Sequence, residues 1–302
     1  MCGSPPQLYV VLPYFNFCGF KRRRQLFIEF VEQMKSVKNI RVIVSAASPL
    51  PRLPVYKQLY FKPTNCIWIK ENLVNLAVEK MPKDWKYVAW IDADITFLNT
   101  NWVRDTMEAL ELWDIVQMFH TVVNLGPRGE AFKTDKGFAY MHRKSGTPYV
   151  KNDKYGFWHP GYAWACSRKA WDQMGGLLDW AILGSGDRHM AMAWIGRVRD
   201  SCPGNIHKDY MAMLEEYQML CKGLEISNID GTILHHWHGS LANRRYRERW
   251  SILTNYEFTP VDDIVYDSQN MLRLTEPGLR MSDELTGYFI GRMEDDSIPS
   301  TS

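Results

Sequence analysis

The sequence predicts an α/β protein organised around one mixed, mainly parallel sheet flanked by helices. Through the first part of the chain, short apolar runs typical of buried strands alternate with stretches whose apolar residues recur at helical spacing. Strands that alternate with helices form parallel sheets, because each helix carries the chain back to the start of the next strand. A chain of 302 residues is also long enough to bury a full core.

The elements of the first half follow one another in a regular order. Strands are predicted at Leu8–Leu12, Ile40–Ser45, Cys66–Ile69, Tyr87–Ile91 and Ile115–Phe119. The helices between them carry apolar residues three and four apart, and they are predicted at Lys21–Lys35, Glu71–Lys80 and Trp102–Trp113. The proline-rich stretch Pro49–Pro54 is expected to be a loop.

The second half of the chain changes character. The polar stretch Gly126–Gly156 predicts a long loop or a small hairpin. Strands then follow at Gly161–Ser167 and Ile229–His236, and helices at Lys169–Met174, Arg188–Trp194 and His207–Cys221. We therefore predict one domain over residues 1–250, with halves at 1–120 and 121–250, and a C-terminal extension over 251–302. Its polar end, Glu294–Ser302, is expected to fray.

The composition is that of an ordinary soluble protein, with 46% apolar and 23% charged residues. A formal net charge of +2 creates no overall field that demands nucleic acid or an anionic membrane. The six cysteines are scattered without a C-x-x-C pair, which argues against structural zinc and a dense disulfide framework. No apolar stretch approaches the roughly 18 residues that a membrane span needs, and we see no signal peptide. We expect a soluble, cytoplasmic protein.

Two carboxylates, Asp92 and Asp94, follow the apolar strand Tyr87–Ile91. The strand should deliver both side chains to its C-terminal edge, where ligands bind in α/β sheets. Alternation along an extended chain points them the same way, about 7 Å apart. Two oxygen ligands beside a crevice suit a divalent cation that holds a diphosphate. The alternative is that both aspartates only cap the turn after the strand.

Other motifs stand on either side of this pair. Residues 70–77 (KENLVNLA) form a strand-to-helix junction whose helix N-terminus could face phosphate or ribose. Residues 156–161 (GFWHPG) precede a strand, and residues 171–179 (WDQMGGLLD) follow it. In this order the motifs resemble GT-A fold glycosyltransferases of the galactosyltransferase-like or family-2-like D-x-D type, over roughly residues 8–240. Leu177 and Leu178 replace the usual aromatic residue of that superfamily, a mild departure.

The resemblance implies a Rossmann-like fold with a nucleotide-sugar site. In that site Asp92 would contact the ribose or a metal-bound water, and Asp94 would ligate the Mn²⁺ or Mg²⁺ that bridges the diphosphate. A UDP-sugar is the expected donor. Asn72 and Asn75 would also face the nucleotide, although a helix cap and a solvated helix face explain either one alone better.

The resemblance also implies a further metal ligand from the histidine cluster at residues 235–238. In an extended segment His236 and His238 share a face, and we choose His238 because Gly239 lets the backbone approach the phosphates. Imidazole nitrogen suits Mn²⁺ better than Mg²⁺. The alternative is a structural histidine, although three in four residues weaken it.

On the acceptor side the resemblance implies a general base, and Asp187 in the stretch 184–190 (GSGDRHM) is the candidate. The alternative is that Asp187 is the N-cap of the helix that starts at Arg188. If the enzyme retains configuration, Asp187 would orient the acceptor instead. Trp158, His159 and His189 are the candidate acceptor contacts, and Trp158 could equally belong to the core.

Two basic clusters could bind the leaving diphosphate, at Lys21–Arg24 and Arg244–Trp250, or could follow a polyanionic acceptor. Arg22 and Arg244 are the candidates, and solvated helix faces are the alternative for any single arginine. We expect a metal-dependent glycosyltransferase that moves a sugar from a nucleotide-diphosphate-sugar to a glycan or small-molecule acceptor hydroxyl, with inversion. The sharper alternative is a DNA-modifying enzyme acting on a hydroxymethylated base. A metal-dependent phosphohydrolase and an inactive sugar-binding module are less favoured.

Overall fold

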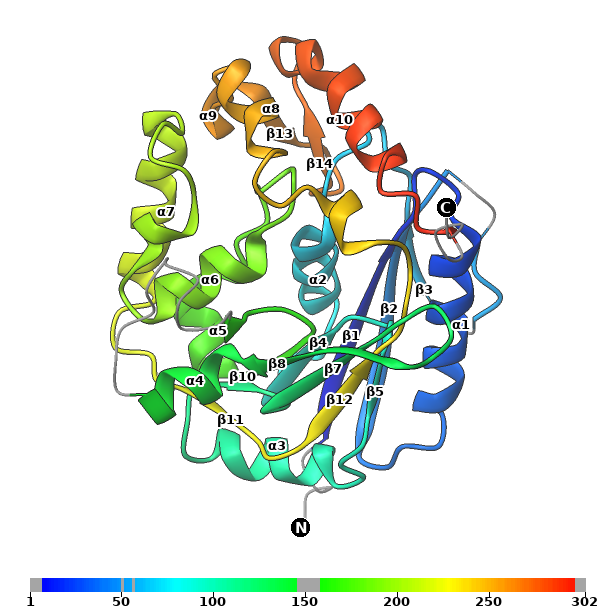
Figure 1. Ribbon diagram of the computed structural model, residues 1–302. Coiled ribbons are helices and arrows are strands. Elements are labelled where there is room, and N and C mark those ends of the chain that lie inside the picture. Colours follow the sequence, from blue (N-terminus) through cyan, green and yellow to red (C-terminus); the bar gives the residue numbers. More distant parts are fainter. Residues whose placement is uncertain (1–6, 50–51, 56–57, 146–157, 297–302) are drawn as a thin grey trace.

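The computed structural model describes residues 7–49, 52–55, 58–145 and 158–296. Within these residues the main sheet has seven strands in the order β11-β6-β10-β4-β1-β2-β3 (Figure 1). They are β1 (Leu8–Phe15), β2 (Ile40–Ala47), β3 (Gln58–Phe61), β4 (Tyr87–Ile91), β6 (Ile115–Gln117), β10 (Ala163–Ser167) and β11 (Ile226–Asn228). Only β10 runs antiparallel to its two neighbours among the strands of this sheet. The predicted mixed, mainly parallel α/β sheet is confirmed.

Both faces of this sheet are buried, as the alternation along its strands requires. In β4, Val88 and Trp90 join one hydrophobic cluster, and Tyr87, Ala89 and Ile91 join the other. The flanking helices are α1 (Lys21–Met34), α2 (Lys70–Glu79), α3 (Trp102–Leu110), α4 (Phe138–Ser145), α5 (Arg168–Met174), α6 (Gly186–Trp194) and α7 (Lys208–Leu220). The buried side chains of α1 and α3 pack on one face of the main sheet, and those of α2, α5, α6 and α7 pack on the other face.

A second sheet, which the sequence did not predict as such, has the strand order β5-β12-β7-β8-β9. Its strands are β5 (Ile95–Phe97), β7 (Thr121–Leu125), β8 (Ala131–Gly137), β9 (Trp158–His159) and β12 (Thr232–His235). β12 pairs antiparallel with β5 and parallel with β7. This sheet therefore joins the segment after β4 to a segment from the far end of the second half.

The C-terminal elements gather at the end of the molecule toward which β1 runs (Figure 1, orange to red). They are α8 (Trp250–Asn255), α9 (Pro260–Asp263), β13 (Ile264–Tyr266), β14 (Leu272–Leu274) and α10 (Ser282–Ile290). Short 3₁₀ turns lie at Val198–Ser201, Leu241–Arg244 and Pro277–Met281. Phe258, Leu285 and Phe289 share one hydrophobic cluster with Leu73 of α2, so the extension packs on the main body.

Three expectations about elements need correction. The strand predicted at Cys66–Ile69 is irregular chain, because its buried residues Ile67 and Ile69 lead directly into α2, and the strand lies earlier, at β3. The expected hairpin is present in part of Gly126–Gly156, because β8 pairs antiparallel with β7, but the stretch also contains the helix α4, and residues 146–157 lie outside the described part. Glu294–Asp296 does not fray, since Glu294 is ion-paired and buried, while residues 297–302 are not described.

Among the described helices none combines the length and the apolar character needed to cross a bilayer.

Candidate functional site

A cleft of about 690 Å³ opens where β1 and β4 end. Its described lining includes eight lysines and arginines against four aspartates. The cations are Arg23, Lys70, Lys133, Arg188, Arg244, Arg247, Arg249 and Arg292, and the acids are Asp92, Asp94, Asp135 and Asp187. This excess of positive charge, at the edge where α/β sheets bind ligands, favours an anion.

Asp94 meets two histidines at the floor of the cleft because β5 pairs with β12. The register sets Ile95 opposite His235, and the backbone N–H of His236 donates to the carbonyl of Asp94 at 2.8 Å. The strand ends at His235, and the chain then turns through Gly239, whose φ of 90° favours glycine. His238, the residue before Gly239, lies back beside His235.

The three side chains have the spacing of ligands around one ion. His238 Nε2 lies 2.9 Å from Asp94 Oδ2 and 3.2 Å from His235 Nε2, and His235 Nε2 lies 3.9 Å from Asp94 Oδ2. Ligands about 2.1 Å from an ion and at right angles lie about 3.0 Å apart. Asp94 Oδ1 is buried without a hydrogen-bond partner among the described residues. The cluster Asp94, His235 and His238 could therefore hold a metal ion.

The outer ring nitrogens of both histidines face acceptors. Asn124 Nδ2 donates to Asp135 at 3.1 Å, which leaves its Oδ1 to accept from His235 Nδ1 at 2.9 Å. His238 Nδ1 lies 3.3 Å from Glu294 Oε2. Such partners fix the ring and its tautomer in metal sites.

The protonation of these groups suits ligands. Burial lowers the pKa of His235 to about 3, so the imidazole is neutral at pH 7. Burial alone would raise the pKa of Asp94, but His238, His235 and Arg23 lower it below its usual value. A neutral imidazole and an ionised carboxylate are the forms that bind metals.

Lys70 joins two further carboxylates of the cleft, those of Asp92 and Asp187. Its ammonium lies 2.8 Å from Asp92 Oδ1 and 3.1 Å from Asp187 Oδ1, and its side chain is almost completely buried. Burial would lower the pKa of Lys70, but Asp187 and Asp92 raise it above its usual range. Burial raises the pKa of Asp92 to about 6, against the opposing effect of Lys70.

The start of α6 places Asp187 in the cleft. A Cβ on Gly186 would lie 2.7 Å from the Glu71 carboxyl, so only glycine lets the helix start so close to α2. Ser185, not Asp187, is the N-cap, and it has a left-handed φ of 75°. The alternative role of Asp187 as an N-cap is therefore wrong, and its carboxylate is free to bind Lys70.

An aromatic wall faces these carboxylates. His159 stacks on Tyr162, with ring centroids 4.1 Å apart, and Tyr162 donates to Asn124 Oδ1 at 3.0 Å. Burial lowers the pKa of His159 to about 3. Of the candidate acceptor contacts, His159 lines the cleft.

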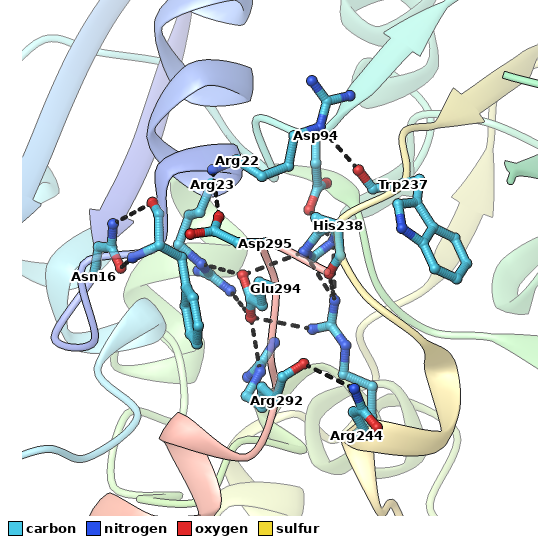
Figure 2. A network of polar contacts seen from close by, with 12 residues as sticks. Asn16, Arg22, Arg23, Asp94, Trp237, His238, Arg244, Arg292, Glu294 and Asp295 are labelled. Carbon is cyan, nitrogen blue, oxygen red and sulfur yellow. Dashed lines mark hydrogen bonds and ion pairs between the residues drawn. The ribbon is translucent and has the colours of Figure 1, made fainter. Parts of the chain in front are cut away.

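The arginines differ from the expectation in one respect. Arg244 lines the cleft, but Arg22 is not among the described lining residues, and its Nε donates to the Trp237 carbonyl at 3.1 Å. The next residue, Arg23, enters the cleft and forms a paired contact with Glu294 (Figure 2). The helical turn of α1 decides which of the four basic residues faces inward.

Four other predicted contacts lie elsewhere. Asn72 and Asn75 both donate to Asp179 Oδ2 at 3.0 Å, and they line a second cavity of about 560 Å³. Trp158 is 5% exposed and packs edge-on against Phe138 in the core. His189 is fully buried between Ser201 and Tyr210. The structure therefore contradicts Trp158 and His189 as acceptor contacts, and it separates both asparagines from the cleft.

Sequence reasoning missed His235, Lys70 and Glu294. His235 was passed over because an extended segment would pair His236 with His238, whereas the strand stops one residue earlier. His236 instead hydrogen-bonds Thr96 at 2.9 Å. Lys70 opens the helix of the motif at 70–77, a signal that was available. Glu294 had no signal, because its partners are distant in sequence.

No model of a known protein family matches the sequence, and no curated protein matches it. Among solved structures, the chain is similar to a mutant of Drosophila β1,4-galactosyltransferase 7 in complex with manganese, UDP-Gal and xylobiose. The identity is 13%, the match covers 92% of this chain and 98% of that chain, and the TM-score is 0.43. It is also similar to glucosyl-3-phosphoglycerate synthase from Mycobacterium tuberculosis in complex with Mn²⁺, UDP and glucosyl-3-phosphoglycerate (10% identity, 90% and 88% coverage, TM-score 0.44).

A third similar structure is a mannosyltransferase from Pyrobaculum calidifontis in complex with GDP-Man and Mn²⁺ (13% identity, 94% and 70% coverage, TM-score 0.40). These three are GT-A fold glycosyltransferases, the group that the sequence motifs resemble. At this level of identity the likeness concerns the fold alone.

Proposed function

We propose that the protein is a metal-dependent glycosyltransferase that uses a nucleotide-diphosphate-sugar. The observation that carries the proposal is the convergence of Asp94, His235 and His238 at the floor of a basic cleft. Two imidazoles and one carboxylate fit Mn²⁺ better than Mg²⁺, which prefers an all-oxygen shell. When bound, the ion would neutralise charge on the departing nucleoside diphosphate.

The residues around the cluster support a diphosphate beside it. Arg23 and Arg244 both line the cleft. Arg244 contacts the His238 ring, and Arg23 donates to Glu294, which also contacts that ring. Guanidinium groups bind phosphate oxygens in a fixed geometry and stay charged at every physiological pH. A UDP-sugar remains our expected donor, and a cleft of about 690 Å³ has the size of a small-molecule site.

Asp187 is our candidate for the group that takes the proton from the acceptor hydroxyl. It lines the same cleft as Asp94, and Gly161 leaves space next to it, since a Cβ there would lie 3.3 Å from Asp187 Oδ2. Lys70 donates to both carboxylate oxygens, at 3.1 and 3.2 Å, which orients the base. This arrangement suits direct attack with inversion, with His159 as an acceptor contact.

DNA is not part of the proposal. The basic cluster Arg244–Trp250 could follow a polyanionic acceptor, but Arg244 and Arg249 both line the cleft that we propose for the donor. Arg244 is 8% exposed and donates to His238, while Arg249 is 6% exposed and donates to Tyr288 at 3.1 Å. A glycan or small-molecule hydroxyl is the acceptor class that we propose.

A thermal-unfolding screen of nucleotide sugars, with and without Mn²⁺, tests the function. A ligand at about 100 times its Kd stabilises the native state by about 2.7 kcal/mol, which raises the Tm of a chain of this size by about 4 °C. We expect a UDP-sugar to give this shift only with Mn²⁺, and to be slowly hydrolysed. Asp94→Asn should abolish both effects.

The control and the alternative belong to the same screen. Asp172→Asn, at an exposed position outside this cleft, should respond like the wild-type protein. A phosphohydrolase would cleave p-nitrophenyl phosphate with Mn²⁺ and show no preference for nucleotide sugars. Such a result, or an unchanged response in Asp94→Asn, would refute the transferase.

A further inference from the structure

The C-terminal segment Arg292–Asp296 follows the last helix, and its Glu294 lies beside His238 of the candidate metal cluster (Figure 2). Asp295 accepts from the backbone N–H groups of Lys21 and Arg22 at 3.0 and 2.7 Å, and so caps the start of α1. Trp237 Nε1 donates to the Asp296 carbonyl at 3.1 Å. The segment therefore connects α1 to the loop that carries His238.

Glu294 is the centre of this connection. Its side chain is 1% exposed, and Arg23 binds it through two contacts of 2.7 Å. Arg292 Nε lies 2.8 Å away and Arg244 Nη1 lies 3.7 Å away. The same carboxylate reaches His238 Nδ1 at 3.3 Å (Figure 2). One buried anion thus fixes three cleft arginines and one candidate ligand.

The contact with His238 matters because two neighbours compete for its Nδ1. Arg244 Nη2 lies 2.9 Å from this atom, and a guanidinium can only donate. If Nδ1 accepted from Arg244, the ring proton would sit on Nε2, the atom that faces Asp94. An ionised carboxylate can only accept, so Glu294 favours the proton on Nδ1. The Nε2 lone pair then faces Asp94, and Arg244 Nη2 also lies 3.1 Å from Nε2.

We propose that Glu294 is a positioning residue of the metal site, which keeps the Nε2 lone pair of His238 directed at the point shared by Asp94 and His235. Asn124 does the same for His235, so each histidine has its own acceptor behind it. The proposal rests on the metal site of the proposed function. It makes Glu294, but not the neighbouring Asp295, part of the surroundings of the metal site.

Titration of the protein with Mn²⁺ alone, followed by the loss of the free-ion EPR signal, tests the proposal without donor or acceptor. Removal of an outer partner of a ligand typically weakens metal binding by about 10–100-fold. We expect this loss in Glu294→Gln, together with a changed visible spectrum of the Co²⁺-loaded protein. Asp295→Asn, on the same segment but facing α1, should lower the Tm and leave Mn²⁺ affinity within about twofold of wild type.

Glu294→Asp covers the case in which Glu294→Gln does not fold. It keeps the charge that the arginines require and withdraws the carboxylate from His238 by one methylene, so Mn²⁺ affinity should again fall. Wild-type affinity in a folded variant of either kind overturns the proposal and leaves the proposed function standing. A wild-type protein that binds no Mn²⁺ overturns both.

Discussion

At the scale of single residues, the candidate site depends on which histidines face Asp94. His235 and His238 direct Nε2 toward it, while His236 lies on the other side of the strand and bonds Thr96. The three histidines are almost adjacent in sequence, so they provide variants matched in size, chemistry and location.

We predict that His235→Gln weakens Mn²⁺ binding by at least about tenfold and lowers turnover of the nucleotide sugar in proportion, because one of three protein ligands is lost. His236→Gln should keep Mn²⁺ affinity, since only a hydrogen bond to Thr96 is altered. Isothermal titration with Mn²⁺ and a turnover assay on both variants decide the matter. Equal losses in the two variants would contradict the assignment of ligands.

A second residue-scale prediction concerns Glu71, which is buried beside Lys70. Burial raises the pKa of Glu71 to about 8, although Lys70 opposes the shift. The folded state therefore binds a proton that the unfolded state releases near pH 4.5. The contribution of Glu71 to stability is fully present below that pH, is lost as the pH rises to about 8, and is constant above it.

Glu71→Gln should remove this dependence. The amide can still accept from Trp68 Nε1, which lies 2.8 Å from the carboxylate in the native protein. We expect urea unfolding to give similar free energies for both proteins near pH 5, and a variant more stable by roughly 2 kcal/mol at pH 9. A variant less stable than the wild type at pH 9 would show that the ionised carboxylate is stabilising.

At the scale of elements, helix α2 contacts both the main cleft and the C-terminal extension. Its first residue, Lys70, binds Asp92 and Asp187, and its polar face binds the C-terminal extension. Asn72 donates to Asp179 and to the carbonyl of Asn270, and it accepts from the backbone of Leu272, each at 3.0 Å. In the motif at 70–77, Lys70 therefore faces the cleft, whereas Asn72 holds the C-terminal extension in place.

We predict that Asn72→Ala destabilises the protein by about 2–3 kcal/mol, because one buried and two partly buried hydrogen-bonding groups lose a partner. Its kcat and KM, measured well below the Tm, should stay close to wild type, since Asn72 does not line the main cleft. Asn101→Ala, at an exposed position, is the control for an asparagine without such contacts. A large rise in KM for the donor would restore Asn72 to the nucleotide site.

The elements also differ in how well the sequence alone predicts them. Long helices such as α1 and α7 were predicted within a few residues, because several turns of apolar spacing define them. Three-residue strands such as β5 are too short to show alternation, and β5 is a strand only because β12 pairs with it. The position of Asp94 at the end of a buried strand could be predicted from the sequence, whereas the position of His235 beside it depends on that pairing.

At the scale of the whole molecule, charge is distributed unevenly. The chain carries a formal net charge of only +2, yet the main cleft concentrates positive side chains. Low-dielectric walls focus such a local field, so a nearly neutral protein can still attract an anion to one site. The total charge in the sequence could not reveal this, because it depends on which residues the fold brings together.

This distribution predicts a salt dependence that the net charge does not. With Mn²⁺ held saturating, the affinity for UDP should fall about fivefold or more between 50 and 500 mM NaCl, as screening shortens the reach of the cleft charges to a few ångströms. Uridine, which carries no phosphate, should show little change in the same titration. The difference between the two ligands isolates the diphosphate contribution from general effects of salt on the protein. If UDP and uridine lost affinity in parallel, the arginines and lysines of the cleft would not contact the phosphates, and the diphosphate would have to bind elsewhere.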